Sequence, residues 1–283
     1  RILSDPCSQI RSAKATDEGR KTEMRPAGVE YHRPTDTASA ISILQEHGDE
    51  ARVIAGGHSL IPMMKLRMAD LAHVIDLQDI VEMKGIEIGA DSVTLGAMVT
   101  QHELITHDGL AAAVPIIREA ALQIADPQVR YVGTIGGNVA NGDPGNDMPG
   151  LMQCLNASFE LAGADGTRSV AARDFYEAAY FTARDDEEIL TRITIPVPAA
   201  GTGQAYEKQK RKIGDYATAA AAVMVGAGSA SVAMTNLADT PIWSAEASAA
   251  LAGGDVEGCV AAMLDAIDPV EDNRGPVESK KHV

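Results

Sequence analysis

The sequence of 283 residues predicts an α+β protein with a larger N-terminal domain and a smaller C-terminal one. Short β-branched runs that end in glycine turns alternate with segments whose apolar residues recur at helical spacing. A proline- and glycine-rich stretch from Pro196 to Gly201 is typical of a domain boundary. We therefore expect a first domain over residues 25–200 and a second over residues 201–283.

Residues 1–24 are expected to form a flexible extension. They are polar and charged, and their few apolar residues follow neither a helical nor a strand period. Met24 is a suitable natural start, and we assign the preceding residues no function.

The first domain is expected to begin with a helix and two strands. Thr35 and Asp36 can cap a helix that ends near Gly48. A strand over 52–55 follows, and a second apolar strand covers 73–77. This order predicts a small βαβ-like start to the domain.

The remaining elements rest on similar signals. Hairpins surround glycine-containing turns, and Pro115 interrupts a helix early, because proline is tolerated only near a first turn. The expected strands cover 86–88, 93–95, 158–161, 168–171, 189–195, 217–225 and 231–235, and the expected helices cover 110–125, 149–155, 245–251 and 258–267.

A glycine pair stands at the centre of the stretch from Val53 to Arg67. A β-branched run leads into Gly56 and Gly57, which tolerate a left-handed backbone and let another group approach the main chain closely. Consecutive free N–H groups in such a turn form a concave anion site, and a following helix would strengthen it. We interpret the stretch as a pyrophosphate cradle, and an ordinary turn is the alternative on these residues alone.

A second stretch of the same character runs from Gly133 to Asp147 and contains the pair Gly136 and Gly137. Two glycine turns in one domain suggest one dinucleotide held from two sides. The run Asn-Gly-Asp-Pro-Gly over 141–145 is also ordinary turn chemistry, so that both interpretations stay open here.

Composition and charge exclude several classes of partner. The net charge of −16 argues against a nucleic-acid partner and against direct contact with an anionic membrane. With 45% hydrophobic but only 4% aromatic residues, the core must be aliphatic. No apolar run approaches the roughly 18 residues of a membrane helix, and no signal peptide is visible.

The three cysteines, Cys7, Cys154 and Cys259, are scattered and form no CxxC pair. We therefore expect neither an iron–sulfur ligand set nor a structural zinc site in this chain. Scattered cysteines fit a reducing compartment, so we expect a cytoplasmic protein.

Several motifs resemble those of a known family. Ala55-Gly56-Gly57-His58-Ser59 followed by Met64-Lys65-Leu66-Arg67, and then Thr134-Ile135-Gly136-Gly137-Asn138, resemble the paired flavin motifs of the FAD-binding medium subunits of molybdenum hydroxylases, particularly the aerobic carbon monoxide dehydrogenase type. The resemblance extends from about Tyr31 to His282. Further similar segments are 31–34, 73–77, 96–100, 126–130, 210–217 and 235–241.

The resemblance implies FAD held in a vanillyl-alcohol-oxidase (PCMH)-type domain, with both glycine turns against the diphosphate and the flavin. It places Asp147 near ribityl or ribose hydroxyls, Leu190 beside the ring, and Lys208 near the flavin, although the match of Lys208 needs a gap. It also implies a tyrosine at the position where this sequence has Ser279. It further implies a closing helix at the C-terminus, and we do not expect that helix in a chain that stops at Val283.

No acid–base constellation accompanies these motifs, so we expect no catalytic residue. His58 and Ser59 invite a nucleophile interpretation, but adjacent residues rarely face each other as nucleophile and base. Ser59 and Asn138 are better interpreted as hydrogen-bonding a phosphate or flavin, with turn stabilisation as the alternative. The irregular spacing of the other histidines predicts surface or core positions and no metal site: His32, His47, His73, His102, His107 and His282. A flavin does its own redox chemistry, while the protein supplies binding and orientation.

By resemblance, the chain passes electrons from iron–sulfur clusters through FAD to an external acceptor. The implied partners are a large subunit with molybdopterin and a small subunit with iron–sulfur clusters, in a dimer of heterotrimers. The substrate stays open among carbon monoxide, N-heterocycles, aldehydes and acyl-CoA thioesters. The alternatives are a self-contained flavin-dependent reductase or oxidase of the same fold, and a non-enzymatic assembly module that has lost the cofactor.

Overall fold

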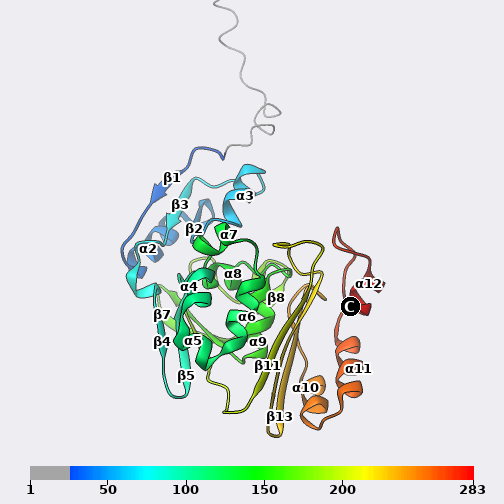
Figure 1. The fold of residues 1–283 in the computed structure, drawn as a ribbon. Coiled ribbons are helices and arrows are strands. Elements are labelled where there is room, and N and C mark those ends of the chain that lie inside the picture. The colour runs from blue at the N-terminus through cyan, green and yellow to red at the C-terminus, as the bar shows by residue number, and fades with distance from the viewer. Residues whose placement is uncertain (1–25) are drawn as a thin grey trace, which may run out of the picture.

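The computed structural model describes residues 26–283, so the extension expected over 1–24 lies outside the described residues. Sheets of three, five and four strands follow one another, with helices packed between and around them (Figure 1). The mixture of helices with largely antiparallel sheets confirms the predicted α+β class. Among the described residues, no helix combines the length and the apolar character needed to cross a lipid bilayer.

The N-terminal sheet is small and parallel. Its strands lie in the order β1 (Glu30–His32), β3 (His73–Asp76) and β2 (Ala51–Ile54). Helix α2 (Thr37–His47) begins where the Asp36 carboxylate accepts a hydrogen bond from the Ser39 backbone, as the predicted cap requires. Helix α3 (Leu60–Lys65) follows the glycine loop after β2. This sheet therefore carries the first glycine stretch at the end of a strand.

The central sheet has five antiparallel strands, and both predicted hairpins form in it. Its order is β4 (Ile86–Ile88), β5 (Ser92–Gly96), β10 (Ile189–Pro196), β6 (Ser158–Gly163) and β7 (Gly166–Ala171). Between β5 and β6 run the helices α4 (Gln101–Thr106), α5 (Asp108–Ala113), α6 (Pro115–Gln123), α7 (Pro127–Val132), α8 (Ile135–Ala140) and α9 (Asp147–Cys154). A two-stranded sheet, β8 (Tyr176–Ala178) and β9 (Phe181–Thr182), and the 3-10 helices Val81–Met83 and Ala172–Asp174 complete this part, while a further 3-10 helix, Gly48–Glu50, connects α2 to β2.

The C-terminal sheet is antiparallel and covered on both faces. Its strands are β11 (Gly203–Gln209), β12 (Ala219–Gly226), β13 (Ser229–Thr235) and β14 (Ile242–Trp243), and helices α10 (Ala245–Ala252), α11 (Val256–Ala266) and α12 (Val277–His282) follow (Figure 1). The cross-strand pair Ala222 and Ala233 faces the main core. The next pair, Val223 and Val232, faces a smaller cluster with α10 and α11. The alternation follows from the two-residue period of a strand.

The predicted boundary near residue 200 falls on the connection between β10 and β11. The main hydrophobic core nevertheless continues across it, because Tyr206 and Ala222 belong to the same buried cluster as Ile193. The division into two domains at this point stays a prediction.

Two predictions about helices differ from the structure. The helix expected over 110–125 with an early interruption at Pro115 is two separate helices, because Pro115 lacks a backbone N–H and begins α6 instead of continuing α5. A short closing helix, α12, does form at the end of the chain. The Lys280 side chain, with the residue only 3% exposed, stabilises α12 by donating to the Val270 carbonyl and pairing with Asp272.

Candidate functional site

A cavity of about 790 Å³ lies between the N-terminal sheet, helices α8 and α9 and strands β10 and β11. This volume is within the range of small-molecule and cofactor sites. Twelve of the thirteen residues predicted as cofactor contacts line it: Ala55, Gly56, Gly57, His58, Ser59, Thr134, Gly136, Gly137, Asn138, Asp147, Leu190 and Lys208. The thirteenth, Ile135, is fully buried in the core and does not line the cavity. As cofactor contacts, these residues stay a prediction.

The first glycine loop offers an unusual set of free donors. Among the described residues, no acceptor lies within hydrogen-bond reach of the backbone N–H groups of residues 56–59. Gly57 has a φ of +74°, which turns the chain so that successive N–H groups can face one point. Buried or half-buried N–H groups are normally paired, so this loop fits an anionic ligand.

Gly56 serves a different purpose. A Cβ atom at this position would lie 2.2 Å from the carbonyl oxygen of Val132, so the two main chains touch here without an intervening side chain. Because glycine has no side chain, the loop after β2 can pack directly against the end of α7. This contact sets the position of the loop relative to α8.

The second glycine stretch is not a turn, which corrects the prediction. Thr134 caps α8, its hydroxyl accepts the Gly137 N–H, and the Gly136 N–H donates to the Ala97 carbonyl. The Asn138 N–H donates to the Thr134 carbonyl, so these donors are already used within the protein. Gly136 is needed for close packing, since a Cβ there would lie 2.5 Å from Ala97. This stretch shapes the cavity wall and does not repeat the free donors of the first loop.

A buried charge pair forms part of the wall. The Lys208 Nζ lies 2.8 Å from Asp147 Oδ2, and the Tyr206 hydroxyl donates to Asp147 Oδ1 at 2.5 Å. The side chains of Lys208 and Asp147 are 1% and 5% exposed. Burial raises the pKa of the Asp147 carboxyl, while the Lys208 ammonium and the Tyr206 hydrogen bond oppose that change. The two oxygens of Asp147 keep lone pairs for a further donor.

Two other predicted residues take defined positions. Leu190 lies on β10 and contributes a 5% exposed apolar side chain to the wall. The Asn138 side chain accepts the Met148 N–H at 3.3 Å, which supports turn stabilisation at the start of α9. Ser59 makes no side-chain capping bond to α3.

The sequence interpretation missed Gln101. This residue is 2% exposed, lines the cavity, and has no hydrogen-bond partner for either amide atom within residues 26–283. Buried polar groups are nearly always paired, so Gln101 fits a polar ligand group. Its position at the start of α4, after the capping residue Thr100, carries no local signal of a binding role. Arg184 and Tyr216 also line the cavity and were not predicted.

The fold brings three of the histidines together. His32, His47 and His73 are partly buried and lie together, although they are far apart in the sequence. His58 is exposed at the cavity, and the His102 ring lies tilted against the ring of Tyr131.

Comparison with known proteins identifies the family. Residues 24–198 match the model of the FAD-binding domain in molybdopterin dehydrogenase. The chain belongs to this family. The carbon monoxide dehydrogenase medium chain of Afipia carboxidovorans is 54% identical over 265 residues, which cover 90% of this chain and 92% of that one. Caffeine dehydrogenase subunit beta of a Pseudomonas species is 34% identical over 77% of this chain and 76% of that one.

Solved structures give the same result for the fold. A chain of the reconstituted CO dehydrogenase from Oligotropha carboxidovorans has a TM-score of 0.87 and 55% identity, and the match covers 91% of this chain and 93% of that one. The predicted family and the fold of an FAD-binding domain followed by a C-terminal α+β part are thereby confirmed.

FAD, the cofactor of this family, fits the residues of the cavity. Its diphosphate matches the unpaired N–H groups of residues 56–59, and its polar groups match the unpaired Gln101 amide. Leu190 offers an apolar surface of the kind that a flavin ring requires.

Proposed function

We propose that this chain is the electron-transferring FAD subunit of a molybdenum hydroxylase that oxidises carbon monoxide. The observation that carries this proposal is the loop of residues 56–59, whose four backbone N–H groups have no acceptor among the described residues. The loop borders the cavity of about 790 Å³, in which a dinucleotide cofactor can be bound. The 54% identity with a carbon monoxide dehydrogenase medium chain supports this substrate over N-heterocycles and aldehydes. A bound flavin supplies the redox chemistry, because it accepts electrons and passes them to an external acceptor.

The chain's own residues bind and orient the cofactor. Residues 56–59 hold the diphosphate through their N–H groups, and Gln101 hydrogen-bonds a polar group of the cofactor. Lys208 and Tyr206 fix the Asp147 carboxyl, whose remaining lone pairs accept a ribityl or ribose hydroxyl. Leu190 packs on the ring and keeps water from it.

The partners follow from the same proposal. A large subunit carries molybdopterin, a small subunit carries the iron–sulfur clusters, and the complex is a cytoplasmic dimer of heterotrimers. Large apolar side chains stand exposed at the cavity, with Met68 70% and Tyr180 58% exposed. Exposed apolar side chains grouped at a site favour coverage by another protein.

A self-contained flavin reductase or oxidase would need, at the cavity, an acid or base that is not already paired with another charged group of the protein. The buried charges of Asp147 and Lys208 bind each other, which favours a positioning role over acid–base chemistry. We therefore retain electron transfer as the proposed function.

The test is purification of the native complex through this chain, followed by metal and flavin analysis and a visible spectrum under carbon monoxide. We expect molybdenum, iron and FAD with two partner chains, and loss of the flavin band on adding the gas to an anaerobic sample. Caffeine and glyceraldehyde serve as matched donors of the other substrate classes.

If caffeine or glyceraldehyde reduces the flavin and carbon monoxide does not, the proposed substrate is wrong. A yellow chain without metal that reduces its own flavin with a donor would support the self-contained enzyme. A colourless folded chain that takes up no FAD would contradict the binding site itself.

A further inference from the structure

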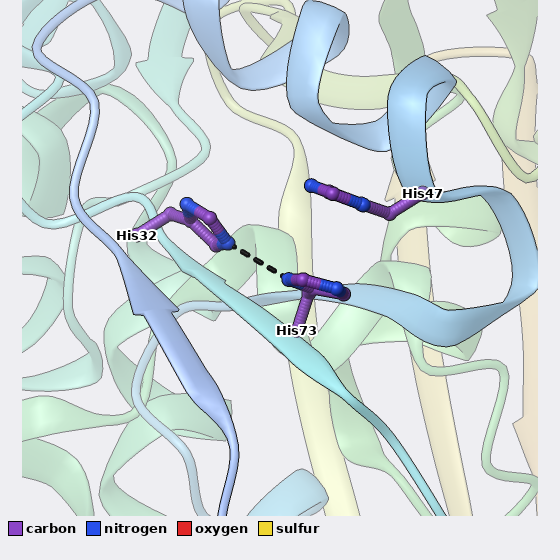
Figure 2. Close-up of side chains that lie close together, drawn as sticks. All are labelled: His32, His47 and His73. Carbon is purple, nitrogen blue, oxygen red and sulfur yellow. Dashed lines mark hydrogen bonds between the residues drawn. The ribbon is translucent and has the colours of Figure 1, made fainter.

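Three histidines from three different elements meet on one face of the N-terminal sheet (Figure 2). His32 ends β1, His47 ends α2, and His73 begins β3. The Nε2 atom of His32 lies 3.0 Å from Nδ1 of His73, and one ring nitrogen from each histidine lies within 4.8 Å of the other two. The cluster is separate from the FAD cavity, whose lining contains none of these residues.

The register of the sheet explains this meeting. In the parallel pair of β1 and β3, Glu30 is opposite His73 and His32 is opposite Ile75. Because side chains alternate along a strand, Glu30, His32 and His73 share one face, and Ile75 of that face belongs to the core beneath α2. Helix α2 packs on this face, so that His47 in its last turn lies against the side chains of β1 and β3.

We propose that His32, His47 and His73 bind one divalent transition-metal ion of the zinc type. Zinc–nitrogen bonds of about 2.0–2.1 Å in tetrahedral geometry separate ligand nitrogens by about 3.3 Å. The His32–His73 separation of 3.0 Å is already close to this spacing. Imidazole ligands suit zinc, copper and nickel and do not suit magnesium or calcium, which prefer oxygen.

Glu30 supplies the fourth ligand. Its Oε2 lies 3.7 Å from Nδ1 of His73, and its side chain is 67% exposed and can turn toward the ion. A set of three imidazoles and one carboxylate satisfies a four-coordinate zinc ion. The carboxylate also offsets part of the charge of the ion.

His47 must turn to join the site. Its ring is now parallel to that of His73, with centroids 3.6 Å apart and an interplanar angle of 9°, so their nitrogens do not point at one centre. His47 is the last residue of α2 and is only partly buried, so joining the site requires a change of its side-chain rotamer at a helix end. Binding would thus replace the stacked pair by a coordinated one.

The ion would cross-link three elements of the N-terminal part. It would join β1, β3 and the end of α2, and β3 is the strand that pairs with β2 before the glycine loop. An ion that binds only the folded state raises stability by mass action. The site therefore stabilises the small sheet that carries residues 56–59, and its existence does not depend on the substrate of the complex.

The test uses the complete chelator-treated chain and ZnCl2, with titration calorimetry for stoichiometry and a thermal melt for stability. His47→Gln and His73→Gln remove ligands, and His282→Gln removes an exposed histidine of α12 as the matched control. We expect one zinc ion per chain and a higher melting temperature with zinc. Each ligand variant should weaken binding by more than the about 10- to 100-fold typical of outer-shell changes, and the control should bind as the unchanged chain does.

The absorption spectrum of the cobalt-substituted chain reports whether the ion is four-coordinate. Far-ultraviolet circular dichroism shows whether each variant has folded. If His73→Gln does not fold, His47→Gln, at a partly exposed helix end, still tests the proposal. Absence of saturable zinc binding would overturn the proposal. So would zinc binding that survives both ligand substitutions, or that is lost equally in the His282→Gln control.

Discussion

Lys208 and Asp147 form a buried ion pair across the C-terminal sheet and helix α9, with 2.8 Å between Nζ and Oδ2. Lys208 lies on β11 and Asp147 on the first turn of α9, so the pair joins the two predicted domains at the cavity wall. Removing one member leaves the other charge buried without compensation. The pair therefore connects the stability of the chain to the shape of its site.

Replacing Lys208 by methionine should lower the free energy of unfolding by about 3–5 kcal/mol, because Asp147 then stays buried without its counter-charge. Denaturant unfolding measures this loss, and Lys212→Met, at an exposed position, is the control. The double variant with Asp147→Asn should recover part of the loss. A single-variant loss below about 1 kcal/mol, as for a surface pair, would contradict the account.

Gln101→Leu separates binding from folding. In the FAD-free chain neither amide atom has a partner among the described residues, so the leucine variant should be as stable as the unchanged chain or more stable. With FAD the variant should lose about 1–3 kcal/mol of binding free energy, or about 5- to 150-fold in Kd. Fluorescence titration with FAD checks this, with the exposed Gln128→Leu as control. Unchanged FAD affinity would show that the amide does not face the cofactor.

Gly56→Ala tests the contact between the two main chains. The added Cβ would lie 2.2 Å from the Val132 carbonyl oxygen, so the loop must move away from α7. We expect a loss of about 1–3 kcal/mol in stability and weaker retention of FAD, as for other overpacked sites. Gly28→Ala, where a Cβ meets no atom within 4 Å, is the matched control. Equal behaviour of the two variants would refute this close approach.

The ion pair of Arg168 and Glu188 should make stability depend on acid pH. Two contacts of 2.7 Å from the Arg168 guanidinium lower the pKa of Glu188 from its ordinary 4.5. A carboxyl with a lower pKa in the folded state stabilises the fold fully above pH 4.5, and this contribution disappears as the pH falls through the folded-state pKa.

Melting temperatures of the unchanged chain and of Glu188→Gln should therefore differ at pH 7 and converge in acid. Glu177→Gln, at an exposed glutamate, should follow the unchanged chain throughout. A difference that is constant with pH would mean that the stabilisation does not come from the ionised pair.

Local signals predicted the elements that depend on local chemistry. The strand before Gly56, the helix capped by Asp36 and the hairpin between β4 and β5 all appear within two residues of their expected bounds. In these cases a cap, a glycine pair or a short turn fixes the backbone within one element.

Other features depend on contacts that no local pattern reveals. Strand β11 was missed because Tyr206 is its only buried apolar residue, and the neighbouring strand β12 supplies its hydrogen bonds. The second glycine stretch was taken for a turn because glycine pairs are common in turns, whereas the Thr134 cap and the Ala97 contact make it helical. Gln101 and the three clustered histidines become functional candidates only through the tertiary fold.

The most direct measurement for the central claim compares the affinities of the FAD-free chain for FAD and for riboflavin, which lacks the diphosphate. Hydrogen bonds to a charged group contribute about 1.5–3 kcal/mol each, so several from residues 56–59 should make FAD bind more than about 100-fold tighter. Such a preference is the result the account predicts. Equal affinities for the two flavins would contradict the assignment of residues 56–59 as the diphosphate site.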